Sequence, residues 1–191
     1  MTASALQPAA DIDAAVLERA KRGDQEAFAA VIKHYDPGLR ALAYRLLGDA
    51  DRMDDALQEA YVKAFRSLSS FRGESRLGTW LYRIVYNACL DELGRARRVV
   101  QLPLEEAAEP PDGRPDFAEA VADRSELAAA LQELTPEERA AVILVDAQGF
   151  DYRGAGKVLG VPEGTIASRL NRARARVRRA LGEQGARRVG R

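Results

Sequence analysis

The residues "GTIASRLNRARARVRR", Gly164 to Arg179, concentrate positive charge in a chain that has no net charge. Six of these residues are arginine, whereas the whole chain balances 29 Lys+Arg against 29 Asp+Glu. Apolar residues recur along the stretch at helical spacing and predict a helix with one narrow apolar face: Ile166, Leu170, Ala173, Val177 and Leu181. The opposite face, at about 100° per residue, carries Ser168, Asn171, Arg172, Ala175 and Arg179.

A short helix and a tight turn precede this stretch. The segment "DYRGAGKVLG" begins at a capping Asp151 and stops at Gly160, and Val161–Pro162 then turns the chain. The pattern predicts a helix-turn-helix whose second helix reads the major groove with asparagine and arginine, while flanking arginines bind phosphates. A solvated, arginine-rich surface helix is the alternative, but the near absence of acids and the preceding turn favour DNA.

Helical signals also fill the rest of the chain, and no strand pattern appears, so we expect an all-α fold. Asp24 is a plausible N-cap, Pro37 is expected to interrupt the helical pattern, and Gly48 is a stop signal. Thr135, Pro136 and Glu138 have the spacing of a capping box. The expected helical segments are 11–23, 24–35, 37–48, 51–68, 77–98, 125–134 and 135–149, with a loop at 69–76.

An acidic, proline-rich segment divides the chain into two small helical domains. It contains four prolines between Pro103 and Pro115 and therefore cannot form a regular helix. Eight acidic residues lie between Glu105 and Glu126, whereas nine arginines lie between Arg169 and Arg191. This segregation suggests different partners for different parts. The expected boundaries are a domain at 11–98, a flexible linker at 99–124, a domain at 125–184 and a basic tail at 185–191.

Several functional classes are disfavoured. The single cysteine, Cys89, excludes an internal disulfide and a multi-cysteine zinc site, and it is expected to be a buried structural thiol. No paired acid and base, nucleophile, metal site or cofactor motif appears, and "GFDYRGAGKVLG" fails the phosphate-loop pattern, so we expect no enzyme, metal or cofactor. Without a signal peptide or an apolar run of about 18 residues, a cytoplasmic chain with no membrane insertion is expected.

With these elements in place, the sequence resembles the extracytoplasmic-function (ECF, group 4) sigma factors of the sigma-70 family, and within them the actinobacterial SigM-type subgroup. The motifs occur in the family order from about Asp13 to Leu181: "GDQEAF", "DDALQEAYVKAF", "FRGESRLGTWLYRIVYNACLDELGRARR", "LTPEERAAVILVDAQGFDY" and "LGVPEGTIASRLNRARARV". The resemblance implies a sigma-2 domain that binds the polymerase clamp and melts the −10 element, and a sigma-4 domain that binds the polymerase flap and the −35 element.

The resemblance also implies site residues. The core-polymerase contacts match Asp54, Asp55, Gln58 and Glu59. The −10 contacts match Phe71, Arg72, Gly73, Glu74, Ser75, Arg76, Arg83 and Asn87. The −35 contacts match Thr165, Ser168, Arg169, Asn171 and Arg172. At Ala167 the family often has lysine or arginine, so one base or phosphate contact is missing. An anti-sigma factor is a further implied partner.

Two questions stay open at this level. Trp80 could stack on DNA, but its apolar neighbours at i+4 and i+8 favour a core position, whereas Tyr82 and Tyr86 are more plausible surface aromatics. The rival functions are a free-standing helix-turn-helix regulator, which would need neither the single-strand loop nor the acidic docking helix, and a helical adaptor that binds no DNA.

Overall fold

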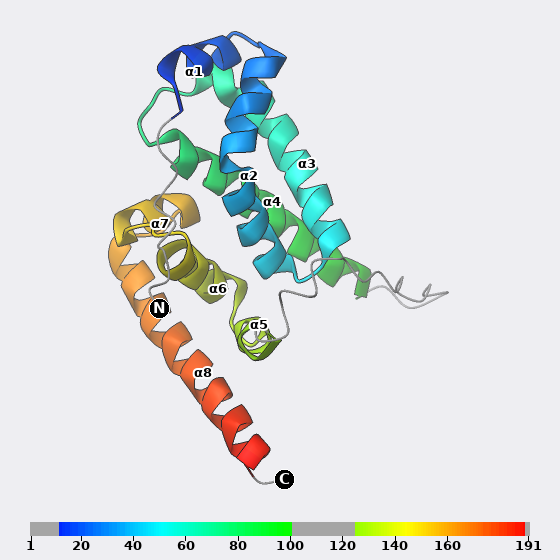
Figure 1. Ribbon diagram of the computed structural model, residues 1–191, viewed down its shortest axis with the longest axis vertical. Coiled ribbons are helices and arrows are strands. Elements are labelled where there is room, and N and C mark those ends of the chain that lie inside the picture. The colour runs from blue at the N-terminus through cyan, green and yellow to red at the C-terminus, as the bar shows by residue number, and fades with distance from the viewer. Residues whose placement is uncertain (1–11, 101–124, 190–191) are drawn as a thin grey trace.

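The computed structural model describes residues 12–100 and 125–189, and within these ranges the regular structure is helical throughout. The N-terminal unit contains α1 (Ala14–Lys21), α2 (Gln25–Leu47), α3 (Ala50–Ser67), the short η1 (Leu68–Ser70) and α4 (Leu77–Val100). Helices α2, α3 and α4 pack against one another, and α1 lies across α2 and η1 (Figure 1). Their shared core is built from large aliphatic side chains such as Leu39, Leu57 and Leu81.

The helices of the N-terminal unit begin where aspartates can accept backbone hydrogen bonds. Asp13, Asp24 and Asp49 are the N-caps of α1, α2 and α3. The Asp24 carboxylate accepts from the Ala27 N–H at 3.0 Å, and this bond, with help from Arg19, lowers the pKa of Asp24. Gly48 ends α2 in the left-handed conformation at a φ of 72°. The predicted start at Asp24 and stop at Gly48 are therefore confirmed.

The predicted interruption at Pro37 is wrong, because α2 continues through this residue for 23 residues in all. A proline inside a helix removes one backbone donor and leaves one carbonyl without its helical partner. Pro37 is exposed, so that carbonyl can bond to water. Packing of α2 against α1, α3, α4 and α6 outweighs the local cost of the proline.

The C-terminal unit contains α5 (Ser125–Gln132), α6 (Pro136–Val142), the π-helical turn η3 (Ile143–Ala147), α7 (Tyr152–Leu159) and α8 (Glu163–Val189). The capping box is confirmed: the Thr135 hydroxyl accepts from the Glu138 N–H, and the Glu138 carboxylate accepts from the Thr135 N–H, both at 3.3 Å. The helix expected at 135–149 changes to π geometry at Ile143 and ends before Gly149, whose φ is 72°.

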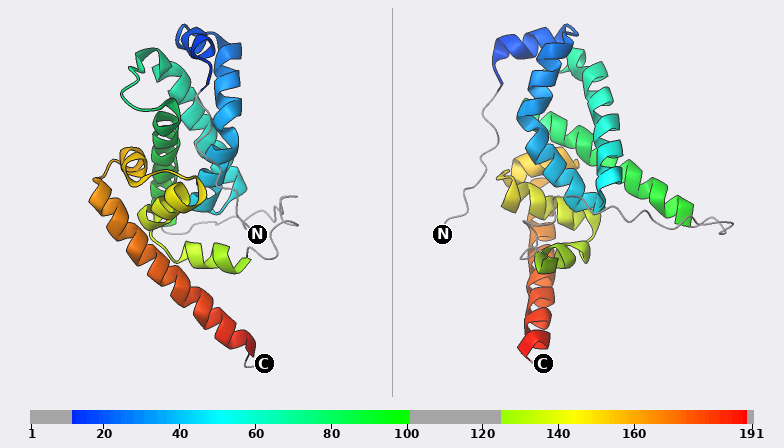
Figure 2. Two further views of the ribbon diagram at one scale, coloured as in Figure 1. Left: turned by 60° about the vertical axis from the view of Figure 1, so that its left-hand side comes forward. Right: turned by 45° about the vertical axis from the view of Figure 1, so that its right-hand side comes forward.

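The two units lie directly against each other (Figure 2). Helix α6 packs on α2, and α7 packs on α4, so one continuous apolar core extends through both units. The acidic linker expected at 99–124 lies outside the described residues, except for Val99 and Val100, which end α4. The basic tail expected at 185–191 overlaps α8, which extends to Val189.

Cys89 is fully buried in this core, as expected from its apolar neighbours. Burial raises the pKa of its thiol to about 12, because a thiolate would lose its hydration there. The thiol is therefore protonated and inert in the folded chain, which agrees with a structural role.

The capping box at the start of α6 allows a direct stability test. Replacing Thr135→Ala removes the side-chain acceptor and should cost about 1 kcal/mol of unfolding free energy, whereas Thr135→Ser keeps the hydroxyl and should cost much less. Urea denaturation followed by circular dichroism measures both variants. Equal stability of the two variants would contradict a capping role for the hydroxyl.

Candidate functional site

The predicted helix-turn-helix is present and consists of α7, the turn at Gly160–Pro162, and α8. Gly160 adopts a φ of 68°, and the Val161 N–H donates to the Gly156 carbonyl at 3.0 Å. A Cβ at Gly156 would lie 2.7 Å from the Val161 carbonyl oxygen, which is closer than atoms can pack. Gly156 therefore lets the turn close against α7, so this glycine contributes to the motif rather than only weakening the helix.

The two faces of α8 are those that the periodicity predicts. Ile166, Leu170 and Ala173 are fully buried against the C-terminal unit. The opposite face is exposed: Ser168, Asn171, Arg172, Ala175 and Arg179. Thr165, Ala167 and Arg169 are half-buried beside it. The Ser168 hydroxyl donates to the Thr165 carbonyl at 2.9 Å.

Carboxylates from neighbouring helices hold three of the α8 arginines. Glu138 of α6, which is only 5 % exposed, accepts from Arg176 at 2.8 Å and lies 3.8 Å from the Arg172 Nε. Asp146 of η3 accepts from Arg174 through both carboxylate oxygens, at 2.6 and 3.2 Å. These pairs could not be predicted from the sequence, because the acids lie on other helices and Glu138 has the spacing of a capping-box residue.

The loop expected to bind the −10 element joins η1 to α4. Phe71 is half-buried, packs against Trp80 with ring centroids 5.3 Å apart, and has the Lys21 ammonium 5.7 Å from its ring centroid. Trp80 packs against the core, as expected. Gly73 has a φ of 76°, which permits the sharp turn of the loop. The remaining loop residues are exposed or half-buried: Arg72, Glu74, Ser75 and Arg76.

Helix α4 presents Arg83 and Asn87 one turn apart on its exposed side. The expectation that Tyr82 and Tyr86 are surface aromatics is wrong, since both are buried. The C-terminal unit covers them: the Tyr82 ring meets the Phe150 ring edge-on at 5.0 Å, and burial raises the pKa of Tyr86 to about 12. A periodicity argument on one helix cannot detect a face covered by a distant part of the chain.

The acidic face of α3 is divided between paired and unpaired residues. Asp54 accepts from Arg40 at 2.7 Å, and Glu59 accepts from Arg95 at 2.8 Å. Arg95 of α4 is held by Glu59 and by Glu92. Asp55 and Gln58 are exposed.

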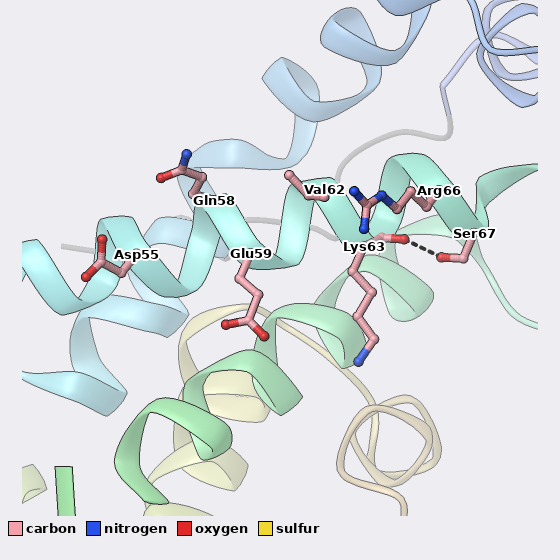
Figure 3. A pocket seen from close by; sticks show the side chains of 7 residues that line it. All are labelled: Asp55, Gln58, Glu59, Val62, Lys63, Arg66 and Ser67. Atoms are coloured by element: carbon pink, nitrogen blue, oxygen red, sulfur yellow. Dashed lines mark hydrogen bonds between the residues drawn. The ribbon is translucent and has the colours of Figure 1, made fainter. Parts of the chain in front are cut away.

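A shallow hollow runs along this outer face of α3 (Figure 3), and its lining extends beyond the expected residues: Asp55, Gln58, Glu59, Val62, Lys63, Arg66 and Ser67. Val62 lies in the middle of this lining, and 45 % of its side chain is exposed. It is one of two large apolar side chains that are exposed among the described residues. An exposed valine at helical spacing from Asp55 and Gln58 was a signal available in the sequence. The hollow combines an apolar centre with charged ends, as a protein-docking surface does.

Metal-binding clusters and membrane-spanning helices can be assessed for the described residues only. Among them, no group of three or more histidine, cysteine, aspartate or glutamate side chains is arranged to hold a metal ion. Over the same part of the chain, no helix has the length and apolar character needed to cross a membrane.

Two family models match the chain. Sigma-70 region 2 covers residues 25–99, and Sigma-70 region 4 covers residues 124–177. The ECF RNA polymerase sigma factor SigM of Mycobacterium tuberculosis is 40 % identical over 170 residues, which are 89 % of this chain and 85 % of that protein. The RNA polymerase sigma-H factor of Pseudomonas aeruginosa is 35 % identical and is matched over 88 % of this chain and 93 % of its own length.

Solved structures show the same fold. The sigma factor RpoE of Bartonella quintana, crystallised with the anti-sigma factor NepR, matches with a TM-score of 0.65 and 32 % identity, covering 81 % of this chain and 96 % of that one. CnrH, solved in complex with the cytosolic domain of CnrY, matches with a TM-score of 0.67 and 23 % identity, covering 88 % and 96 %. The chain therefore belongs to the ECF sigma factors of RNA polymerase, with regions 2 and 4 of the sigma-70 family in its two helical units.

Proposed function

We propose that this alternative sigma factor divides promoter recognition among three surfaces: the α3 hollow for core polymerase, the 71–76 loop with α4 for the −10 element, and the exposed face of α8 for the −35 element. The observation that carries the proposal is the exposed trio Ser168, Asn171 and Arg172 on the second helix of a helix-turn-helix, in a chain that matches both sigma-70 regions. It acts in the cytoplasm and performs no bond-making chemistry.

The α8 face has the chemistry needed to read duplex DNA. Asn171 and Arg172 can each make paired hydrogen bonds to a base edge, and the Ser168 hydroxyl can accept or donate one. Arg169 lies on the flank of this face, where phosphates pass. Glu138 and Asp146 neutralise part of the charge on Arg176 and Arg174, and Glu138 also lies 3.8 Å from the Nε of Arg172, whose side chain stays exposed.

The loop before α4 suits the single strand that forms when DNA opens. Its exposed groups can hydrogen-bond to an unstacked base: Arg72, Glu74, Ser75 and Arg76. Arg83 and Asn87 extend this surface along α4. Phe71 supports the loop by packing on Trp80, so its role is to position the loop rather than to stack freely on a base.

The α3 hollow suits a helical partner with apolar and basic side chains. Asp55 and Gln58 are free to pair across such an interface, and Val62 offers an apolar contact. Asp54 and Glu59 belong to the same surface, but they are already paired within the chain. This surface is the proposed contact with the polymerase clamp, and the C-terminal unit is the proposed contact with the flap.

An anti-sigma factor is the proposed regulator. The solved relative from Bartonella quintana was crystallised with one, and this chain is 32 % identical to that relative. The proposed domain boundaries remain residues 11–98 for region 2 and 125–184 for region 4, with residues 99–124 as the acidic linker between them.

Transcription with purified components tests the function. Adding the chain to core RNA polymerase should produce specific transcripts from a library of duplex promoters. The promoters that are transcribed should have a −35 and a −10 sequence in common. Core polymerase without the chain is the control. A chain that does not bind core polymerase, and instead binds palindromic DNA tightly alone, would contradict the sigma-factor assignment and favour a free-standing regulator.

Arg172 should contribute to base discrimination at the −35 element. The substitution Arg172→Ala should reduce discrimination between the preferred −35 sequence and a single-base variant by about 1–3 kcal/mol. Arg178→Ala removes the same charge from the same helix, and should weaken binding to both sequences equally. Competition binding by the polymerase holoenzyme measures the ratio. A uniform loss with Arg172→Ala would assign this residue to phosphate.

Charge reversal on α3 tests the docking surface. Asp55→Lys places a positive charge in the hollow and should weaken binding to core polymerase by about 1 kcal/mol, since it replaces an attraction by a repulsion. Asp51→Lys makes the same change one turn earlier, outside the hollow, and should have a smaller effect. Fluorescence titration with labelled chain measures both affinities, and equal effects would place the contact elsewhere.

A further inference from the structure

Two chains of side-chain hydrogen bonds reach the acidic face of α3, one from α2 and one from α4. In the first, the Tyr61 hydroxyl donates to one carboxylate oxygen of Asp36 at 2.7 Å, and the Nε of Arg40 donates to the other at 3.1 Å. The Nη1 of Arg40 then donates to Asp54 of α3 at 2.7 Å. Asp36, anchored by Tyr61, therefore holds the Arg40 guanidinium against Asp54.

The second chain has the same construction. The Nε of Arg52 donates to one carboxylate oxygen of Glu92 at 3.1 Å, and the Nε of Arg95 donates to the other at 3.0 Å. The Nη2 of Arg95 then donates to Glu59 of α3 at 2.8 Å, and the Glu59 side chain points from α3 toward α4 in Figure 3. Glu92, anchored by Arg52, therefore holds the Arg95 guanidinium against Glu59.

In both chains the arginine joins an inner acid to an outer acid. The inner acids, Asp36 and Glu92, have side chains that are 31 % and 16 % exposed, whereas the outer acids, Asp54 and Glu59, are 60 % and 47 % exposed. Hydrogen bonds to the outer acids raise the pKa of both arginines, so each guanidinium stays charged. Both outer acids thus have an internal cation beside them.

A purely structural role is the alternative explanation, and the geometry gives it little support. Without the arginines, Asp36 would keep the Tyr61 hydroxyl and Glu92 would keep Arg52. Apolar packing already joins α3 to α2 and α4. An exposed ion pair adds little to such packing, so the outer bonds contribute little to holding the helices together.

The outer bonds do change what a basic partner meets at α3. Asp55 has no ion pair among the described residues and can accept from a partner at once. Asp54 and Glu59 can accept fully only if the partner displaces Arg40 and Arg95, or approaches close to them against like-charge repulsion. Because exposed ion pairs are weak, displacement is possible, but it reduces the net gain from each contact.

We propose that Arg40 and Arg95 are specificity-determining residues, which compete with basic side chains of core polymerase for Asp54 and Glu59 and so lower the affinity of the chain for core polymerase. This inference rests on the proposed function and deepens it. The two outer acids are five residues apart on α3, a rise of about 7.5 Å. The surface therefore favours a partner whose basic side chains are spaced to replace both arginines together.

Binding to core polymerase by the full chain tests the competition. Arg40→Gln and Arg95→Gln remove the two competing charges and leave each inner acid with its other donor. Lys33→Gln is the matched control, because Lys33 is exposed on α2 and has no ion pair among the described residues. Each unlabelled variant displaces fluorescently labelled wild-type chain from core polymerase, and thermal melting followed by circular dichroism checks that each variant folds.

Arg40→Gln and Arg95→Gln should each tighten binding to core polymerase by about two- to fivefold, the range that an exposed ion pair is worth. The double variant should tighten it by about the product of the two effects, since the bridges involve different acids. Lys33→Gln should change it much less. In an Asp54→Asn background the gain from Arg40→Gln should shrink, and in a Glu59→Gln background the gain from Arg95→Gln should shrink.

Three results would overturn the competition. Weaker binding by both arginine variants would mean that the arginines support the surface instead of competing for it. Affinities equal to that of Lys33→Gln would mean that the bridges do not affect docking. An undiminished gain in the Asp54→Asn and Glu59→Gln backgrounds would mean general charge repulsion. If the wild-type chain itself does not bind core polymerase, the proposed function fails, and this inference fails with it.

Discussion

The buried guanidinium of Arg139 joins the two units, and within the described residues its hydrogen-bond partners are backbone carbonyls and not carboxylates. Arg139 is 6 % exposed, and its guanidinium donates to backbone carbonyls at the ends of α5 and α2. Burial lowers the pKa of this guanidinium, yet arginine stays charged at any physiological pH. The cost of dehydrating the charge is offset by carbonyls that would otherwise lack donors.

Glu138, the residue before Arg139, lies on a different side of α6. Its carboxylate is also buried and makes two contacts. It accepts a hydrogen bond from Arg176 of α8, and it completes the capping box of α6. Adjacent residues on a helix point about 100° apart, so one turn of α6 contacts both α2 and the recognition helix. The position of α8 relative to the N-terminal unit therefore depends on two neighbouring charges in a single short helix.

The sequence predicted those features that short-range chemistry determines. Asp24, Gly48 and the Thr135–Glu138 box act within one helical turn, and the apolar face of α8 follows from its period. Features set by distant contacts were missed. Tyr82 and Tyr86 look like surface aromatics until α7 covers them, and Pro37 looks like a break until packing holds α2 together. The arginines of α8 looked equivalent until Glu138 and Asp146 distinguished them.

The strength of the contact between the units limits how it can act. The interface between the units combines one continuous apolar core with a few buried polar bonds, and both favour the closed arrangement of the chain. If only a small fraction of free chains is open, the apparent affinity for a full promoter falls by that same fraction. Polymerase docking adds binding free energy that the free chain lacks.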